Sequence, residues 1–507
     1  MTNPGWLQMH PRDTIAVLTR RAGKGERPLG RGVALERAIE AGHKIALGDI
    51  MPGEAIIKFG QIIGYASVPV VAGEHVHTHN CSMGSHDRDY VIGADFESAL
   101  ASTPKAEPMT FAGYHRDDGT VGTRNYIALV ATVNCSATVI RRAAADINTS
   151  GILDQFPNVD GVVALSHGTG CGMASEGPGH DNLQRVLWGH ATHPNVGAAL
   201  FVGLGCEVMQ IARMRAAYGE GGERFHGLTI QETGGTTRTV EAIVAAIHDL
   251  LPKVNAVSRE PAPVSKLAVA LQCGGSDGFS GITANPALGV ASDMLVGMGG
   301  SVVLAETPEI YGAEQLLLRR AAGQDVADKL LERIAWWEHY TAINGGAMDN
   351  NPSPGNKAGG LTTILEKSLG AVAKAGSAPL GDVLDYGAKL RRPGLTFMDS
   401  PGFDPVSVTG QIASGAQVVV FTTGRGSAFG SKPAPTIKVA SNSRLANAMP
   451  DDMDIDCGGI LDGVSMEEKG REILALIVAT ASGQKSKSEK LGLGDNEFLP
   501  WQIGAVM

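Results

Sequence analysis

The stretch LAVALQCGGSDG, residues Leu267–Gly278, gives the clearest indication of the fold. It starts as an apolar run, passes through Cys273 and ends in glycines and an aspartate. A short apolar run bounded by turn residues is typical of a strand that is buried on both faces, as in a parallel sheet. The stretch therefore predicts a buried strand that delivers a thiol to a glycine-rich loop.

The same pattern recurs on both sides of this stretch. The recurrences are NYIALVATVNCS (125–136), GVVALSHGTGCG (161–172), ALFVGLGCEV (199–208), SVVLAE (301–306), QVVVFTTGRGS (417–427) and TIKVASNS (436–443). Segments with helical spacing follow, such as SATVIRRAAADI (136–147). Buried strands that alternate with helices predict an α/β architecture with parallel sheets.

Changes in this pattern divide the chain into domains. Residues 1–90 contain short strand-like runs between Gly and Pro turns, which predict a small β-rich domain. The polar residues 91–109 predict a linker. Prolines in SREPAPVSK (258–266) interrupt the α/β pattern and separate a middle domain, residues 110–257, from a C-terminal domain, residues 258–507.

Composition excludes several classes of protein. The net charge of −10 argues against a general nucleic-acid binder. No apolar run approaches the roughly 18 residues of a membrane span, and the start lacks the pattern of a signal peptide. Six cysteines without a C-x-x-C pair fit neither a disulfide scaffold nor a zinc ribbon. We therefore expect a cytoplasmic protein with reduced thiols and with no membrane or nucleic-acid partner.

Chemically reactive side chains gather where the predicted strands end. Those that follow strands are Cys135, His167, Cys171, Cys206, Glu207, Cys273 and Glu306. Ligands bind outside the carboxyl ends of strands in such sheets. Core packing explains any one of these cysteines equally well, but four at equivalent positions indicate a soft-metal site that suits iron or zinc.

The segment EHVHTHN places His75, His77 and His79 two residues apart. Alternate side chains of a strand share a face, so these three imidazoles could bind a metal or line an anionic pocket. A polar surface strand is the alternative interpretation.

The chain resembles the altronate/galactarate dehydratase family of sugar-acid hydro-lyases, and within it the galactarate branch more closely. The matching stretches include AGEHVHTHN (72–80), DGTVGTRNYIALVATVNCSATV (118–139), HGTGCGM (167–173), GLGCE (203–207), QCGGSDGFSGITANPALG (272–289) and ETPEIYGAEQLL (306–317). DMDIDCGGILDG (452–463) and LGLGDNEFLPWQ (491–502) favour the galactarate branch. These matches run in order along nearly the whole chain.

The resemblance implies a fold, a cofactor and an activity. The fold is an N-terminal β-clip domain of the SAF type, a middle α/β domain that dimerises, and a C-terminal Rossmann-like domain with a parallel sheet, so a homodimer is expected. The cofactor is Fe2+, with an iron–sulfur cluster or another divalent cation as alternatives. The activity is dehydration of a small-molecule sugar acid, galactarate to 5-dehydro-4-deoxy-glucarate. Altronate dehydratase, a sulfo-lyase and a non-catalytic binding protein remain alternatives.

Dehydration requires removal of a proton next to a carboxylate and loss of the β-hydroxyl, and this chemistry assigns roles. We expect Cys171, Cys206 and Cys273 to bind the metal, followed by Cys135 and His167, unless His167 is the base. Asp277 would orient a hydroxyl or complete the metal shell, and Gly274 and Gly275 would present N–H groups to the anion. The expected cationic clamps are Arg124, Lys357 and Arg425. We further expect a mobile β-clip domain that closes over the substrate with His75, His77 or His79.

Overall fold

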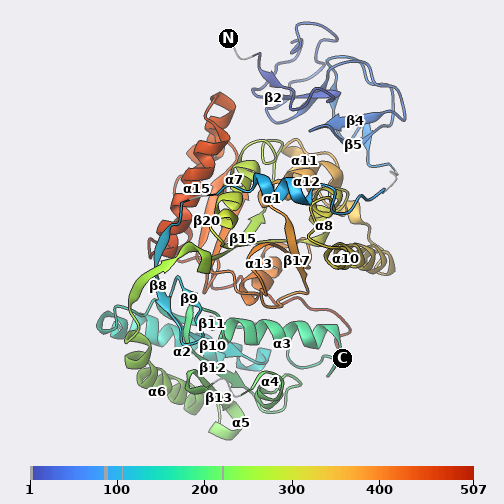
Figure 1. Ribbon diagram of the computed structural model, residues 1–507. Helices are drawn as coiled ribbons and strands as arrows, with labels where there is room; N and C mark the ends of the chain where they lie inside the picture. Colours follow the sequence, from blue (N-terminus) through green and yellow to red (C-terminus); the bar gives the residue numbers. More distant parts are fainter. Residues whose placement is uncertain (1–3, 85–88, 106, 220–221) are drawn as a thin grey trace.

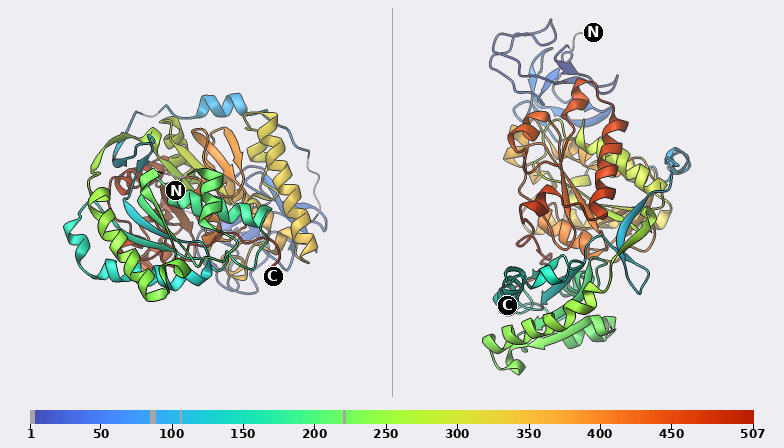
Figure 2. Two further views of the ribbon diagram at one scale, coloured as in Figure 1. Left: turned by 90° about the horizontal axis from the view of Figure 1, so that it is seen from below. Right: turned by 90° about the vertical axis from the view of Figure 1, so that its left-hand side faces the viewer.

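The computed structural model describes residues 4–84, 89–105, 107–219 and 222–507. The β-clip domain lies at one end of the molecule, the middle domain at the other, and the C-terminal domain between them (Figures 1 and 2). The α/β architecture with parallel sheets is confirmed in both larger domains. No helix among the described residues is long and apolar enough to cross a membrane.

The N-terminal domain consists of two small sheets. One has the order β1-β2-β3-β6, with β1 Trp6–Leu7, β2 Ile15–Leu18, β3 Lys44–Ala46 and β6 His75–Val76. The other has the order β4-β5-β7, with β4 Ala55–Lys58, β5 Gln61–Ala66 and β7 Cys81–Ser82. The predicted linker contains a helix, α1 Phe96–Ser102.

The middle domain is built on a four-stranded parallel sheet of order β11-β10-β12-β13. Its strands are β10 Tyr126–Ala131, β11 Gly161–Leu165, β12 Val196–Gly203 and β13 Phe225–Thr229. Its helices are α2 Ala137–Thr149, α3 Pro178–Ala191, α4 Ile211–Tyr218, α5 Ile230–Thr233 and α6 Thr236–Asn255. Both connections to the rest of the chain run through a further sheet, in which β8 Thr110–His115 pairs with β9 Val121–Gly122 and with β14 Arg259–Pro263.

The C-terminal domain contains a seven-stranded parallel sheet of order β17-β18-β16-β15-β19-β20-β21. The strands are β15 Ala268–Cys273, β16 Ser301–Ala305, β17 Leu380–Leu384, β18 Gly394–Met398, β19 Val418–Thr423, β20 Thr436–Ala440 and β21 Ile455–Asp456. Every residue of β15, β19 and β20 is buried, as their continuous apolar runs predict. The chain leaves β15 for β16 on one side and later returns to β19 on the other, so the strand order reverses at β15.

Ten helices of this domain surround the sheet. They are α7 Ala284–Gly297, α8 Thr307–Ile310, α9 Gln315–Leu318, α10 Gln324–Ile343, α11 Pro354–Ala358, α12 Ile364–Val372, α13 Asp404–Ala413, α14 Ser443–Ala448, α15 Met466–Ala481 and α16 Lys487–Lys490. The carboxyl ends of β15 and β16, where ligands of such sheets bind, face α8, α12 and the start of α13.

A buried ion-pair triad joins the β-clip domain to the C-terminal domain. Lys44 Nζ lies 2.8 Å from Glu366 Oε2, and Lys58 Nζ lies 2.9 Å from Glu366 Oε1. The ammonium of Lys44 also donates to Gly360 O at 2.6 Å. The β-clip domain is therefore docked on the C-terminal domain in this structure.

Candidate active site

The four cysteines predicted to form one metal site belong to two different sheets. Cys273 is the last residue of β15, whereas Cys135, Cys171 and Cys206 follow β10, β11 and β12 of the middle domain. Their grouping into a single site is therefore wrong. Across the described ranges, no three or more His, Cys, Asp or Glu side chains are grouped so as to hold a metal ion.

Cys273 lies instead in a buried cluster of charged side chains at the carboxyl end of β15. Its thiol donates toward Glu309 Oε2 at 3.6 Å and accepts a hydrogen bond from Lys374 Nζ at 3.0 Å. Lys367 is paired with the other oxygen of Glu309. Asn351 contacts both partners, because its side chain accepts from Lys367 at 3.0 Å and donates to Glu309 Oε1 at 3.1 Å.

The two lysines keep Glu309 ionised. Burial alone would raise the pKa of Glu309, but the charges of Lys367 and Lys374 hold that pKa below its ordinary value. Burial raises the pKa of the Cys273 thiol above its ordinary value, although the charge of Lys374 opposes the shift. The cluster thus holds an ionised carboxylate and a neutral thiol between two ammonium groups at neutral pH.

A second glutamate in the cluster, Glu306, is held in a strained conformation. It follows β16 with a φ of 75°, in the left-handed region that favours glycine. Its buried carboxyl contacts that of Glu309, and a hydrogen bond between the two helps to lower the pKa of Glu309. Burial, together with the charges of Glu309 and Asp404, raises the pKa of Glu306 well above its ordinary value. The raised pKa of Glu306 favours its protonated form, next to Glu309, whose pKa is lowered.

Asp404, the first residue of α13, completes the cluster. Its Oδ1 accepts from Gln272 Nε2 at 3.3 Å, and burial raises its pKa to about 6. Gly274 makes room for it, because a Cβ at that position would lie 2.3 Å from Asp404 Oδ2. The Gly274 N–H donates to Thr422 O at 3.1 Å, so the predicted role of this N–H in anion binding is wrong. Gly275 O accepts from the N–H groups of Gly424 and Arg425, which joins this loop to the end of β19.

A cavity of about 940 Å³ lies between the β-clip domain and the C-terminal domain. Its lining includes Arg20 from the β-clip domain, Arg425 after β19 and Arg444 in α14, together with the carboxylates of Glu40 and Asp462. The Arg20 guanidinium is already paired with Glu26 at 2.6 Å. Asp277 also lines it, from the same loop that begins at Cys273. Arginines and carboxylates thus line the same cavity, and Arg425, which the sequence predicts to be a clamp, lies on its wall.

The carboxylate of Asp277 accepts hydrogen bonds that hold two loops together. Its Oδ1 accepts from Phe279 N, Ser280 N, Ser280 Oγ and Ser441 Oγ at 2.8–3.1 Å, and its Oδ2 accepts from Asn442 Nδ2 at 3.0 Å. These bonds join the loop after β15 to the loop after β20. We infer that Asp277 shapes the cavity wall rather than orienting a hydroxyl.

The histidines of the β-clip domain form a stack against the C-terminal domain. Ring centroids of His43, His75 and His77 lie 5.1–5.4 Å apart, and His79 lies 5.5 Å from His75. His77 Nε2 lies 2.9 Å from the carbonyl oxygen of Lys357. Burial and the positive charges of neighbouring histidines lower the pKa of His75 to about 2, and burial lowers that of His77 to about 4. Neutral imidazoles that contact the main chain at Lys357 fit a domain contact better than an anion clamp.

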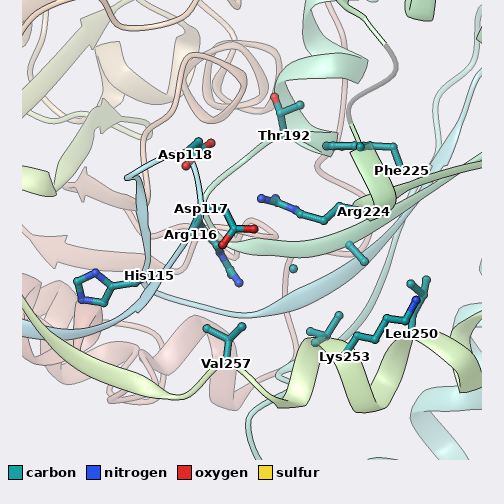
Figure 3. A pocket seen from close by; sticks show the side chains of 14 residues that line it. His115, Arg116, Asp117, Asp118, Thr192, Arg224, Phe225, Leu250, Lys253 and Val257 are labelled. Carbon is teal, nitrogen blue, oxygen red and sulfur yellow. The ribbon is translucent and has the colours of Figure 1, made fainter.

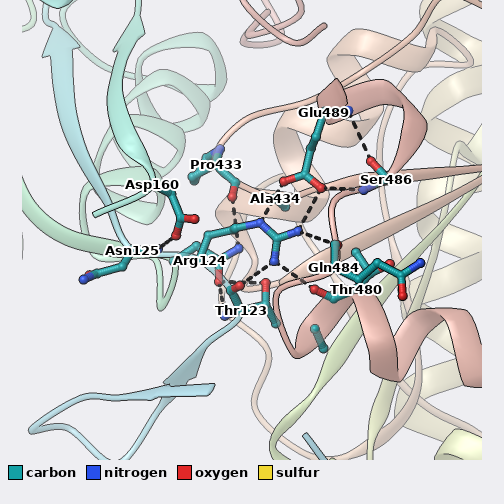
Figure 4. Close-up of polar contacts among 12 residues, drawn as sticks. Thr123, Arg124, Asn125, Asp160, Pro433, Ala434, Thr480, Gln484, Ser486 and Glu489 are labelled. Atoms are coloured by element: carbon teal, nitrogen blue, oxygen red, sulfur yellow. Dashed lines mark hydrogen bonds and ion pairs between the residues drawn. The ribbon is translucent and has the colours of Figure 1, made fainter. Parts of the chain in front are cut away.

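Arg124 and His167 have structural contacts that their predicted roles do not allow. The Arg124 guanidinium pairs with both oxygens of Glu489 at 2.7 and 2.8 Å and donates to Thr480 O (Figure 4). It therefore fastens the C-terminal helices to the middle domain and is not free to clamp a substrate.

His167 contacts Ala131 O through Nε2 and accepts from Thr169 N at Nδ1, and burial lowers its pKa to about 4. With both ring nitrogens engaged, it is neither a base nor a ligand.

A second cavity, of about 590 Å³, lies in the middle domain (Figure 3). Arg116, Arg224 and Asp117 line it, together with Gly197 and Ala198 at the start of β12. It therefore lies at the amino edge of this sheet, opposite the edge where ligands of parallel sheets bind. The cavity beside the C-terminal domain lies at the carboxyl edge of its sheet and includes Asp277 from the loop that begins at Cys273, although no charged residue of the cluster around Cys273 lines it.

Comparison with known proteins gives matches along the whole chain. The model for the altronate/galactarate dehydratase SAF domain matches residues 4–84. That for the second domain of D-galactarate dehydratase/altronate hydrolase matches 113–255, and that for the C-terminal domain of D-galactarate/altronate dehydratase matches 264–506.

Curated proteins show the same relationship. The chain is 39% identical over 490 residues to altronate dehydratase of Bacillus subtilis (strain 168), with 96% of each chain covered. It is 37% identical to altronate dehydratase of Escherichia coli (strain K12), covering 96% of this chain and 97% of the relative. Identity to the galactarate dehydratase (L-threo-forming) of the same strain is 36%, covering 96% and 95%. These values differ too little to choose between the two substrates.

Proposed function

Because the chain belongs to the D-galactarate/altronate dehydratase family of hydro-lyases, as its motifs predict, we propose that it dehydrates a sugar acid at the cluster around Cys273. The supporting observation is that buried carboxyl groups at the carboxyl ends of β15 and β16 have pKa values shifted in opposite directions. The pKa of Glu306 is raised well above its ordinary value, that of Glu309 is lowered, and that of Asp404 is about 6. An acid–base reaction needs one carboxyl group with a raised pKa, which can donate a proton, and another that is ionised and can accept one.

The reaction uses these groups in sequence. Asp404, ionised above pH 6, takes the proton on the carbon next to the substrate carboxylate. Lys367 and Lys374 stabilise the second negative charge that develops on that carboxylate. The carbon–oxygen bond at the β-carbon then breaks, and Glu306 gives its proton to the departing hydroxide, which leaves as water. The enol that forms tautomerises to a 2-oxo acid.

Ferrous iron, which the family resemblance implies, does not fit a preformed single-ion site in this part of the protein. As stated above, the described side chains include no group of three ligands for one ion. The steps above therefore use only the protein's own groups.

For the substrate, we propose the dicarboxylate galactarate, converted to 5-dehydro-4-deoxy-glucarate. Arg425 and Arg444 on the wall of the 940 Å³ cavity support a substrate with two carboxylates, because one guanidinium pairs with one carboxylate. Altronate, a monocarboxylate, is the alternative that the names of two relatives suggest.

A substrate panel tests the proposal. Protein purified anaerobically and supplied with ferrous iron is incubated with galactarate, altronate and their epimers, and the 2-oxo acid product is measured. Glu306→Gln and Lys374→Met should each reduce kcat at least 100-fold. The control Glu332→Gln, which changes an exposed surface carboxylate, should retain full activity. Turnover of altronate alone would reject the substrate, and full activity of both cluster variants would reject the site.

A further inference from the structure

The cavity of about 590 Å³ in the middle domain has no part in the reaction proposed above (Figure 3). It lies where the middle domain meets the C-terminal domain, because its wall includes the turn between β8 and β9, in the sheet that carries both chain connections. Thr192, also on its wall, accepts a hydrogen bond at 2.7 Å from Lys389 Nζ of the C-terminal domain. Junctions between domains are a common place for small-molecule sites. The titratable residues of the wall are His115, Arg116, Asp117, Asp118, Arg224 and Lys253.

Two half-buried guanidinium groups on this wall have hydrogen-bond donors to spare. Arg116 donates to main-chain oxygens, Pro194 O at 2.8 Å and Arg124 O at 3.3 Å. Arg224 Nη2 donates to Val196 O at 2.9 Å, whereas its Nε is buried and has no hydrogen-bond partner among the described residues. Within the same ranges, neither guanidinium forms an ion pair with a carboxylate. A guanidinium has five N–H donors, so both groups can bind a further acceptor.

The two guanidinium groups lie close enough to repel each other. Burial and the charge of Arg224 lower the pKa of Arg116 to about 10. Burial also lowers the pKa of Arg224, although the charges of Asp118 and Asp117 oppose this shift. The ammonium of Lys389 adds to the repulsion, since burial and the charge of Arg224 lower its pKa. An anion bound between the guanidinium groups would relieve this repulsion and use the spare donors.

Two carboxylates on the same wall restrict the kind of anion. Asp117 and Asp118 take the central positions of a turn in which Gly119 N donates to Arg116 O at 2.9 Å. Asp118 Oδ1 already accepts from Thr120 N at 3.0 Å and from Thr120 Oγ1 at 2.6 Å. The carboxylate of Asp117 accepts no hydrogen bond from another described residue, and in Figure 3 it points into the same space as both guanidinium groups. It repels a second negative charge but accepts hydrogen bonds from hydroxyl groups, so the lining favours one anionic group with hydroxyls beside it.

The opposite wall of the cavity is largely apolar. It consists of Leu250 and Val254 in α6, Val257 after this helix and Ala198 in β12. Lys253, exposed in the last turn of α6, adds a positive charge. A mainly apolar wall with a few convergent polar groups is typical of a site for a small molecule, whose carbon chain contacts the apolar part.

We propose that this cavity binds a small hydroxy acid with a single carboxylate. The carboxylate would pair with the guanidinium groups of Arg116 and Arg224, and a hydroxyl would donate to Asp117. The wall joins the β8–β9 turn to β12 and α6, so the bound hydroxy acid would stabilise the junction of the two larger domains. This site is independent of the acid–base cluster, and the proposal does not depend on the reaction assigned to that cluster.

Isothermal titration calorimetry of the full-length protein tests the proposal with D-gluconate as the probe. Hexanoate has the carboxylate but no hydroxyls, and sorbitol has hydroxyls but no carboxylate, while the carbon chain of all three has the same length. We expect gluconate to bind about tenfold more tightly than either, because each charge-assisted hydrogen bond contributes to affinity. Inorganic phosphate that binds more tightly than gluconate would overturn the proposed ligand class, as would equal affinity for gluconate and hexanoate.

Variants assign the binding to this cavity. Arg116→Met and Arg224→Met should each weaken gluconate binding about tenfold or more, for the same reason. Arg142→Met, which changes an exposed arginine of α2 in the same domain, should leave the affinity unchanged. Arg425→Met should also retain it, because Arg425 lines the other cavity. Binding that is lost in Arg425→Met but retained in Arg224→Met would place gluconate in the 940 Å³ cavity and overturn the proposal.

Hydrogen exchange of the unchanged protein gives a measurement that does not depend on the folding of a variant. Gluconate should slow exchange in residues 116–120, the turn between β8 and β9, and in residues 250–257 at the end of α6. Protection confined to the loops after β19 and β20 would contradict the proposal, as would exchange that gluconate does not change.

Discussion

Replacing the carboxylate of the buried triad should detach the β-clip domain. The side chains of Lys44 and Glu366 are 0% exposed and that of Lys58 is 2% exposed. In Glu366→Gln the two ammonium groups lose their counterion. Breaking a buried pair in this way costs roughly 3–5 kcal/mol. The pKa of Glu366 gives a similar magnitude: although burial opposes the shift, Lys44 and Lys58 lower it from 4.5 to about 2, which corresponds to about 3 kcal/mol.

The lowered pKa of Glu366 also determines how docking stability depends on pH. A carboxyl whose pKa is lower in the folded state stabilises the fold above pH 4.5, and this contribution is lost as the pH falls toward 2. Wild-type protein should therefore lose about 3 kcal/mol of docking free energy over that interval. Glu366→Gln should lack this part of the pH dependence.

Hydrogen exchange followed by mass spectrometry measures docking in the full-length protein. In Glu366→Gln, amides of β3, β4 and β5 should exchange at least 100-fold faster at pH 7, and kcat/KM should fall because Arg20 leaves the cavity. Glu472→Gln breaks an exposed pair with Lys469 and should cost at most about 1 kcal/mol. The triple variant Lys44→Met, Lys58→Met, Glu366→Leu should restore protection, since apolar replacement of a buried triad is often neutral. Unchanged exchange in Glu366→Gln would show that the triad does not hold the β-clip domain in place.

Three further outcomes can be measured directly. In wild-type protein kcat/KM should rise as the pH increases through about 6, because the base must be ionised, and Asp404→Asn should abolish this limb of the pH–rate profile. Arg124→Met should lower the free energy of unfolding by roughly 3–5 kcal/mol in urea while leaving KM unchanged, since the side chain pairs with Glu489. Arg425→Met should raise KM for galactarate at least tenfold, and less for altronate, because a charge-assisted hydrogen bond is worth about 1.5–3 kcal/mol.

Strand-end positions could be predicted from the sequence because apolar runs and glycine loops are local patterns. The sequence locates Cys273 and Arg425 in this way, and the structure places Cys273 at the end of β15 and Arg425 on the wall of the 940 Å³ cavity. The separation of Cys273 from the other thiols could not be predicted, because no local pattern tells which sheet a strand joins.

No local sequence pattern indicates that the two lysines near Cys273 belong to the cluster. Lys367 lies in α12, and Lys374 lies directly after it. In EKSLGAVAKAG they look like ordinary polar positions of a surface helix, and only tertiary packing shows that both are buried. Arg124 illustrates the converse, because a lone arginine in GTRNY gives no indication of the Glu489 carboxylate 365 residues later.

Glu306 separates a catalytic interpretation of the cluster from a purely structural one. Glu306 lies in the left-handed region, which costs a non-glycine residue about 1–3 kcal/mol. Neighbouring contacts hold the strained backbone, since Glu306 N donates to Ser400 Oγ at 3.1 Å and Thr307 Oγ1 donates to Asp399 Oδ1 at 2.5 Å. Glu306→Gly removes the strain, whereas Glu306→Gln retains it, and both variants remove the proton that the reaction needs. We therefore expect both to lose turnover, while the glycine variant exceeds the glutamine variant in free energy of unfolding by about 1 kcal/mol or more. Turnover in either variant would show that Glu306 is not the proton donor, and a glycine variant less stable than the glutamine variant would show that its backbone stores no strain.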